Sequence, residues 1–289
     1  MSHLLCFGLG YSALRVARRL AANGWSIGGT ARTAEGAASI AAQGFAAYVF
    51  DGTAPGRGVD EALAKATHVL ISVPPDAAGD PVLGHHGGAL ARAPHLAWIG
   101  YLSTVGVYGD QQGGWVDETT AADPVSERGR RRVVAEEAWL ALAARSGVRA
   151  HVFRLAGIYG PKRSALDRLR EGTAQRIVKP GQVFNRIHVD DIAEAVCAGI
   201  AGRGALEVYN VTDDEPSPPQ DVIAYAAQLL HIPSPPDVAF EDAQLSPMAA
   251  SFYADNKRVR NARLRQDLGV GLKFPSYREG LQAILAAEH

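Results

Sequence analysis

Residues 3–13 read His-Leu-Leu-Cys-Phe-Gly-Leu-Gly-Tyr-Ser-Ala, an apolar strand that runs straight into a glycine loop. Residues 14–20 then have the apolar spacing of an amphipathic helix. This G-x-G-x-x-A pattern lets Gly8 make the tight turn, lets Gly10 admit a pyrophosphate and lets Ala13 bring helix and strand together. The helix N-terminus adds free N–H groups and a partial positive charge. The predicted dinucleotide-binding residues of this loop are Gly8, Gly10, Tyr11, Ser12 and Ala13.

Strand-like and helix-like segments alternate through the first half of the chain. Strands are predicted at 3–7, 25–31, 45–50, 68–73 and 95–102, with helices at 33–43, 59–65 and 84–92. This alternation predicts a Rossmann-type doubly wound α/β fold, a parallel sheet with helices on both faces. Beyond a strand at 148–155 the pieces are shorter and interrupted by prolines. We expect a cofactor domain in 1–160, with segments near 187–212 packing onto it, and a smaller C-terminal substrate lobe in 161–289.

Parallel sheets of this type bind ligands at the carboxyl ends of their strands. The predicted strands end at Gly8, Arg32, Asp51, Ser72 and Ser103. NAD sites usually carry an acid at the end of the second strand, but Arg32 stands there and suits the 2′-phosphate of NADP. NADP(H) is therefore favoured over NAD(H), although Arg32 is also consistent with an ordinary solvated loop residue. Asp51 is either an acceptor for the adenine amine or a turn aspartate, and Ser72 is a further cofactor contact.

Composition excludes several classes of function. The 289 residues carry a formal net charge of -1, which argues against a nucleic acid or an anionic membrane as partner. No apolar run is long enough to span a bilayer, and the first strand starts too early to leave room for a signal peptide. Two cysteines without C-x-x-C spacing suggest reduced thiols in a cytoplasmic protein. No metal site is expected, and a homodimer is an open possibility.

The segment YLSTVGVYGD at 101–110 resembles the extended short-chain dehydrogenase/reductases, which include NAD-dependent epimerases and dehydratases acting on nucleotide sugars. RLAGIYGP at 154–161, IHVDDIA at 187–193 and YNV at 209–211 are similar to the same superfamily. The likeness covers nearly the whole chain. It implies the Rossmann fold, a nicotinamide cofactor and a small-molecule substrate.

In that family a Ser or Thr ends the fifth strand, and a Tyr-x-x-x-Lys pair opens the next long helix. The resemblance implies that the tyrosine moves a hydroxyl proton while hydride passes to or from the nicotinamide, and that the lysine assists it. Here Thr104 falls at the hydroxyl position, with Ser103 beside it. The alignment puts Arg128 in place of the tyrosine and Arg132 in place of the lysine.

This replacement changes the expected chemistry. A guanidinium cannot carry a proton back and forth at neutral pH. Arg132 is predicted to contact the cofactor, and Arg128 to bind an anionic group of the substrate. Both arginines are also consistent with a solvated helix start in which Arg132 and Glu136 form an i,i+4 pair. The chain therefore resembles the atypical short-chain dehydrogenase/reductases, and among them a bacterial subgroup of nucleoside-diphosphate-sugar epimerase-like proteins.

Other groups must then move protons if the protein is an enzyme. His188 lies at a strand-to-helix junction and belongs to a residue type suited to acid–base work at neutral pH. Asp190 or Asp191 is expected to cap the helix that follows. Thr104, Ser103 and His188 are the catalytic candidates.

Many nucleotide-sugar enzymes of the family carry an arginine four residues before this histidine, but Phe184 stands at that position here and Arg186 stands two residues before it. The resemblance therefore does not extend to recognition of a diphosphate sugar. Arg186 is the predicted substrate-binding residue, because it can favour an anion together with Lys162, Arg163 and Lys179. Three functions stay open on the sequence. The first is an NADP(H)-dependent oxidoreductase or epimerase with a rearranged acid–base set. The second is a non-catalytic NADP(H)-binding sensor or regulatory protein, and the third is a scaffold that has lost the dinucleotide.

Overall fold

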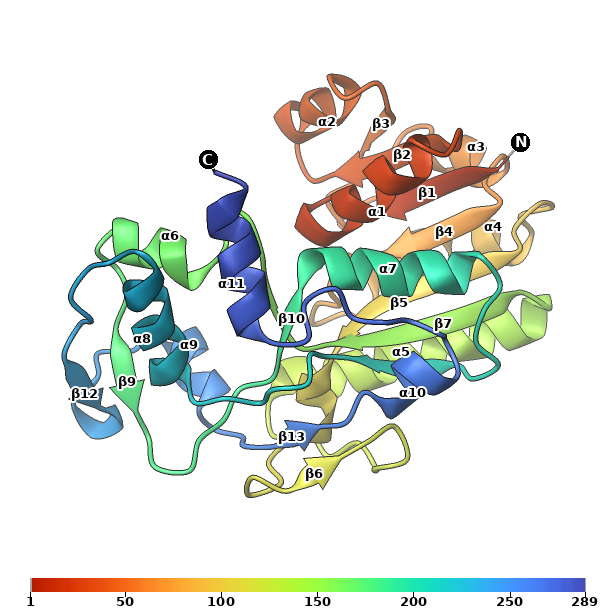
Figure 1. The fold of residues 1–289 in the computed structure, drawn as a ribbon. Coiled ribbons are helices and arrows are strands. Elements are labelled where there is room, and N and C mark those ends of the chain that lie inside the picture. Colours follow the sequence, from red (N-terminus) through yellow and green to blue (C-terminus); the bar gives the residue numbers. More distant parts are fainter. Residues whose placement is uncertain (1, 289) are drawn as a thin grey trace.

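The computed structural model describes residues 2–288, and its elements are shown in Figure 1. The strands are β1 (His3–Phe7), β2 (Ser26–Ala31), β3 (Ala46–Val49), β4 (His68–Ile71), β5 (Trp98–Thr104), β6 (Trp115–Val116), β7 (Arg149–Leu155), β8 (Gly157–Tyr159), β9 (Arg176–Val178), β10 (Arg186–His188), β11 (Val208–Val211), β12 (Asp237–Ala239) and β13 (Arg258–Val259). The α-helices are α1 (Tyr11–Ala21), α2 (Ala34–Ala41), α3 (Val59–Leu63), α4 (Pro81–Ala91), α5 (Glu127–Ser146), α6 (Ala165–Arg170), α7 (Val189–Ile200), α8 (Pro219–Leu229), α9 (Pro247–Phe252), α10 (Ala262–Gln266) and α11 (Tyr277–Ala286). Two short 3-10 helices are η1 (Val105–Tyr108) and η2 (Phe240–Asp242).

The central sheet has seven strands in the order β11-β7-β5-β4-β1-β2-β3, and all its pairings are parallel. β1 lies between β2 and β4, so the strand order reverses direction at β1. Ligands of doubly wound sheets bind outside the carboxyl ends of the strands at this reversal. The predicted Rossmann-type fold is confirmed.

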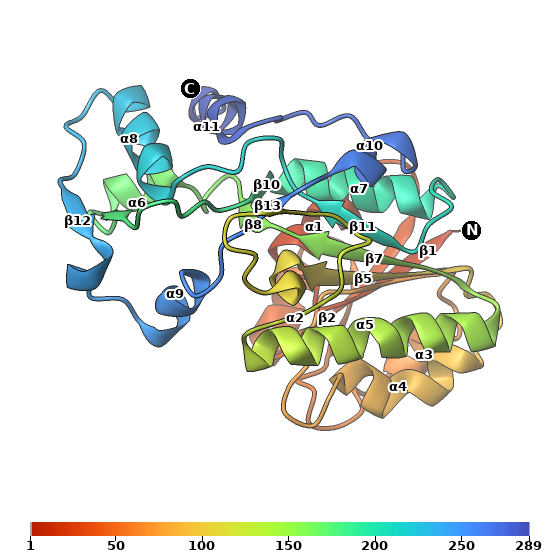
Figure 2. The same cartoon turned by 90° about the horizontal axis from the view of Figure 1, so that it is seen from below.

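Two hydrophobic clusters cover the two faces of the sheet. One cluster joins α1 and α7 to the sheet, and the other joins α3, α4 and α5 to the opposite face. Figure 2 shows α4 and α5 on one side of the strands and α7 on the other. On α1 the buried residues Ala13, Val16, Ala17 and Leu20 recur with helical spacing. The apolar stripe seen in the sequence therefore becomes the face that packs on the sheet.

A second, smaller lobe stands beyond the carboxyl ends of the strands (Figure 1). Its core gathers side chains of α6, α8 and α11 around Tyr159 and Leu166. β9 and β12 form a small parallel sheet within it. The chain also returns to the large sheet, because β11 pairs with β7 and α7 packs against α1.

Some element boundaries differ from the sequence expectation. The fifth strand was expected at 95–102, but β5 runs from Trp98 to Thr104, since Leu96 closes a turn back to Ala93. α5 starts at Glu127, where the Ser126 hydroxyl accepts a hydrogen bond from the Gly129 N–H at 3.0 Å. Thr104 is thus the last residue of β5.

Within residues 2–288 no helix has both the length and the apolar composition needed to cross a membrane. Cys6 is buried and Cys197 is half-buried, and both are free thiols.

A buried polar pair links two neighbouring strands of the sheet. The Trp98 indole N–H donates to His151 Nδ1 at 3.0 Å, and both side chains are buried. Burial lowers the pKa of His151 from 6.5 to about 4. The unfolded chain therefore takes up a proton on this histidine at a higher pH than the folded chain does.

This difference predicts a loss of stability as the pH falls from 6.5 towards 4. His151 contributes at most about 3 kcal/mol to that loss, from a pKa difference of about 2.5 units. His151→Gln, which keeps an acceptor near Trp98, should flatten the pH dependence of the unfolding free energy measured with urea. The control is His95→Gln, which replaces an exposed histidine. If the unfolding free energy of His151→Gln depends on pH as steeply as that of the wild type, the prediction is contradicted.

Candidate functional site

The glycine loop has the geometry that its sequence predicts. Gly8 adopts a left-handed backbone with φ +80°, and its N–H donates to the Thr30 hydroxyl at 2.9 Å. A Cβ at this position would lie 3.1 Å from Val73 Cγ2. Gly8 is therefore required by both backbone conformation and packing against the segment after β4.

Gly10 is the N-cap residue of α1, and no side chain caps this helix. A Cβ added to Gly10 would meet nothing within 4 Å, so the space beside its backbone is open. The first turn of α1 contains no acid, and Ser12 and Ala13 are buried behind it. The helix amides and the open space together form a cradle that suits a phosphate group.

Three other predicted cofactor residues follow strands on the same edge of the sheet. Arg32 follows β2, is exposed and has no hydrogen bond or ion pair with any described residue. Asp51 accepts hydrogen bonds from the Thr53 N–H at 2.9 Å and the Thr53 hydroxyl at 2.8 Å, as a turn aspartate does. Ser72 is half-buried directly after β4. Arg32 is thus the one of these three that carries a free charge.

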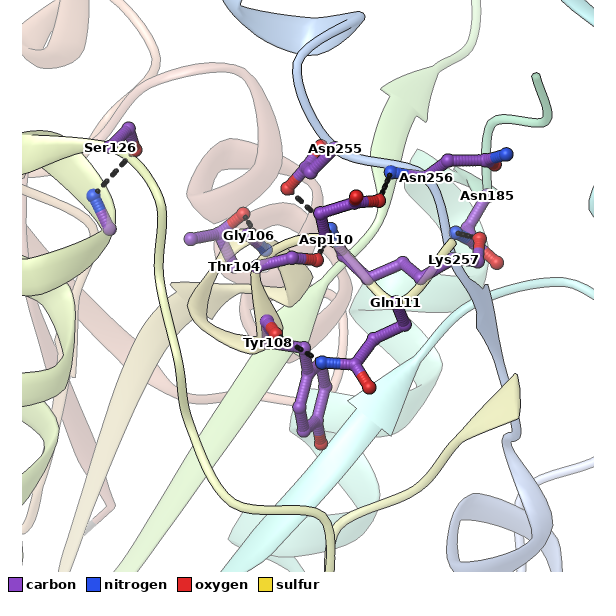
Figure 3. A network of polar contacts seen from close by, with 12 residues as sticks. Thr104, Gly106, Tyr108, Asp110, Gln111, Ser126, Asn185, Asp255, Asn256 and Lys257 are labelled. Atoms are coloured by element: carbon purple, nitrogen blue, oxygen red, sulfur yellow. Dashed lines mark hydrogen bonds and ion pairs between the residues drawn. The ribbon is translucent and has the colours of Figure 1, made fainter. Parts of the chain in front are cut away.

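Ser103 and Thr104 end β5 but have different surroundings. Ser103 is buried, and its hydroxyl donates to the Glu136 carboxylate. Thr104 is half-buried, and its hydroxyl accepts from the Gly106 N–H at 3.1 Å (Figure 3). The Thr104 oxygen can still donate its proton, so it is the better placed of the two hydroxyls for a ligand.

Glu136 belongs to a buried polar network that the sequence analysis did not foresee. Arg154 and Glu136 form an ion pair at 2.7 Å, with both side chains buried. Arg154 also donates to the Tyr108 hydroxyl at 2.9 Å, and that hydroxyl donates to Asn210 Oδ1 at 2.8 Å. Burial raises the pKa of Tyr108. These groups are hydrogen-bonded to one another, so the Tyr108 hydroxyl is already occupied inside the protein.

The two arginines of α5 that replace the expected tyrosine and lysine are arranged differently. Arg132 is buried and donates to Leu102 O at 2.7 Å and to the Tyr101 hydroxyl at 3.1 Å. Its Nε is buried without a partner. The alternative of an Arg132–Glu136 pair is wrong, because Glu136 binds Arg154 instead.

Arg128 lies one helical turn before Arg132 on the same side of α5. It is exposed and makes no hydrogen bond or ion pair with residues 2–288. Its neighbours Arg130 and Arg131 share Glu127, at 3.0 and 3.2 Å. Arg128 therefore keeps a free positive charge at the end of the helix that faces the carboxyl edge of the sheet.

His188 itself caps α7, which corrects the expectation that Asp190 or Asp191 does so. Its Nδ1 accepts from the Asp190 N–H at 3.1 Å, while Asp191 is occupied by the backbone N–H groups of Lys273 and Phe274. Burial lowers the pKa of His188 to about 4, although Asp190 opposes the shift. The ring is therefore neutral at pH 7, with its proton on Nε2.

The Arg186 side chain is hydrogen-bonded within the smaller lobe. Its guanidinium donates to Phe184 O at 3.0 Å and to the Ser217 hydroxyl at 2.7 Å. Nearby Asp213 is buried, with one carboxylate oxygen that lacks a partner. No group of histidines, cysteines and acids within residues 2–288 is arranged to hold a metal ion.

Loops from the two lobes meet beside Thr104 in a second polar network (Figure 3). Asp110 accepts from the Asn256 N–H at 2.8 Å, and buried Lys257 donates to Gly109 O at 2.9 Å and to Asp255. These contacts border a pocket of about 500 Å³ that Lys179 and Arg258 also line. The loop after β5 is therefore tied to the smaller lobe on one side of the candidate site.

Comparisons with known proteins agree with this fold. Residues 90–212 match the sequence model of the NAD-dependent epimerase/dehydratase family. Protein YeeZ of Escherichia coli K12 is 28% identical over 229 residues, covering 73% of this chain and 77% of YeeZ.

Two solved structures match nearly the full length. A functionally unknown conserved protein from Silicibacter pomeroyi is 50% identical over 100% of both chains, with a TM-score of 0.90. A structure from Methylobacillus flagellatus, named provisionally as an NAD-dependent epimerase/dehydratase, is 28% identical, with a TM-score of 0.72 over 99% of this chain and 98% of that one. This chain therefore combines a parallel Rossmann-type sheet and a glycine loop with a segment, residues 90–212, that is similar to the NAD-dependent epimerase/dehydratase family.

Proposed function

We propose that this protein binds NADP(H) at the carboxyl edge of its large sheet and is an oxidoreductase or epimerase without the usual Tyr-x-x-x-Lys pair. The observation that carries the proposal is the open space beside Gly10 at the uncapped N-terminus of α1. Such a cradle accepts a pyrophosphate through backbone N–H groups. The family description adds that relatives depend on NAD.

The 2′-phosphate of NADP has a natural partner in Arg32. This side chain is exposed and unpartnered among the described residues, and β2 ends without an acid that would repel a phosphate. Guanidinium groups bind phosphate through two parallel hydrogen bonds. Glu35 lies on α2 and is exposed, so NAD(H) is the second choice of cofactor.

A bound nicotinamide supplies or accepts a hydride. The Thr104 hydroxyl, which receives a hydrogen bond from Gly106, is free to donate its own proton to a substrate oxygen. His188 is neutral and carries a proton on Nε2, so its role is that of a hydrogen-bond donor more than a base. Arg128 is free to hold an anionic group of the substrate. The substrate is a small molecule whose identity is open, with sugar nucleotides as one class.

A second candidate function is a non-catalytic NADP(H)-binding sensor. What favours it is that Ser103, Tyr108 and Arg132 are all hydrogen-bonded inside the protein. In that case the dinucleotide is held but no proton donor completes a reaction. A cytoplasmic location and a homodimer stay predictions.

Gly10→Ala tests the cradle directly. Because the added methyl meets no protein atom, the melting temperature should stay within a few degrees of the wild type. The same methyl occupies the space for the pyrophosphate, so calorimetric affinity for NADP⁺ should fall by at least about tenfold, or 1.4 kcal/mol. If the wild type and Gly10→Ala bind NADP⁺ with equal affinity, the pyrophosphate does not bind beside Gly10.

Arg32→Ala tests the choice of cofactor. Losing a charge-assisted contact to the 2′-phosphate should weaken NADP⁺ binding by about tenfold to a hundredfold and leave NAD⁺ binding nearly unchanged. The control is Arg145→Ala, which removes an exposed arginine from the last turn of α5. A parallel loss for both dinucleotides would refute the assignment of Arg32 to the phosphate.

Turnover separates the enzyme from the sensor. With NADPH bound, oxidation of the nicotinamide is followed by absorbance across a panel of carbonyl compounds. With NADP⁺ bound, sugar nucleotides are analysed by chromatography for an epimerised product, because epimerisation returns the hydride and leaves no net change in the cofactor. An enzyme should turn over at least one of them, and Thr104→Val should lower kcat by about tenfold to a hundredfold with NADPH affinity retained. The control is Thr119→Val on an exposed loop. Tight NADPH binding without turnover in the panel would favour the sensor.

A further inference from the structure

A tight turn connects β8 to the smaller lobe. Gly160 and Arg163 exchange two backbone hydrogen bonds, at 3.2 and 3.0 Å. Lys162 within the turn has φ +63°, a conformation that few side chains adopt. The turn is therefore a defined structure that fixes the backbone position of Arg163.

This turn packs directly against the first residue of α1. The Tyr11 hydroxyl donates to Pro161 O at 3.1 Å. A Cβ on Gly160 would lie 2.5 Å from that hydroxyl, so glycine is what permits the approach. The Arg163 guanidinium lies over the Tyr11 ring, 5.6 Å from its centroid. A cation of the smaller lobe thus stands beside the helix N-terminus that carries the Gly10 cradle.

No acidic residue among residues 2–288 forms an ion pair with Arg163. The side chain is exposed and makes no hydrogen bond or ion pair with residues 2–288. Asp167, close in sequence, accepts from the Ser164 N–H and hydroxyl at 2.8 and 2.5 Å. Arg15, the other cation near Tyr11, lies 3.5 Å from Asp190. Burial raises the pKa of Tyr11, and Arg15 and Arg163 oppose that shift.

We propose that Arg163 binds the pyrophosphate of the dinucleotide, so that the smaller lobe supplies a cofactor contact opposite the glycine loop. The proposal rests on the proposed function, since it requires a dinucleotide at α1. The helix N-terminus and a guanidinium both attract a phosphate, and no acid in the first turn of α1 opposes them. Tyr11 positions the arginine through its ring and fixes the turn through its hydroxyl.

Binding measurements on Arg163→Ala test the proposal without relying on activity. Calorimetric dissociation constants are compared for NADP⁺, NAD⁺ and adenosine 2′-monophosphate, which has the 2′-phosphate but no pyrophosphate. We expect Arg163→Ala to weaken NADP⁺ and NAD⁺ alike by about tenfold and to leave adenosine 2′-monophosphate within about twofold. Arg163→Lys should recover part of the loss, because it restores the charge. Arg32→Ala should instead weaken NADP⁺ and adenosine 2′-monophosphate and leave NAD⁺ nearly unchanged.

Lys162→Asn is the matched control. It removes one positive charge from the same turn, and asparagine tolerates the left-handed backbone at this position. Its effect on NADP⁺ should stay below about threefold, and thermal unfolding checks that each variant is folded. Unchanged NADP⁺ affinity in Arg163→Ala would overturn the role of Arg163 and leave the proposed function standing. Equal weakening of all three ligands would also overturn it, and a wild type that binds neither dinucleotide would overturn both proposals.

Discussion

The buried ion pair between Glu136 and Arg154 is the constraint on which the site region depends. It joins α5 to β7 in the interior, where charges are tolerated only when they are paired and hydrogen-bonded. Ser103 and Tyr108 supply the additional hydrogen bonds, and Tyr108 passes the network on to Asn210 in β11. One connected set of polar groups thereby sets the relative positions of β5, η1, α5, β7 and β11. Removing one member would leave its partners buried with unmet hydrogen-bonding capacity.

This constraint also determines which groups are left for a ligand. The hydroxyls of Ser103 and Tyr108 are occupied by the network. Arg132 is directed into the sheet, onto Leu102 O. Among the described residues, those still available at the carboxyl edge include Thr104, as a hydrogen-bond donor, and the exposed arginines Arg32 and Arg128. The edge is therefore better equipped to hold anions than to exchange protons, and this fits a dinucleotide-binding protein with unusual acid–base chemistry.

The candidate site has two sides, and they come from distant parts of the chain. The glycine loop and α1 form one side. The turn that contains Arg163 and the loops around Asp110 and Asn256 form the other. Both contacts bridge more than a hundred residues of sequence, so the smaller lobe is tied to the domain of the large sheet at two places. Binding of a dinucleotide between them would add to those ties.

The sequence alone determined the parallel sheet, its glycine loop and the family likeness. These features rest on local signals, such as the apolar strand 3–7, the small residues that follow it and the helical spacing after them. The sequence did not predict that Ser103 would bind Glu136, that His188 would cap its own helix or that Arg163 would lie beside Tyr11. Each of these depends on which partners the tertiary structure brings within about 3 Å, or within contact of a ring, across long separations in the chain. Residue type and spacing define what a side chain is able to do, but only packing decides which hydrogen bonds and charges are already used, because a buried polar group must be satisfied by whatever neighbour the fold supplies.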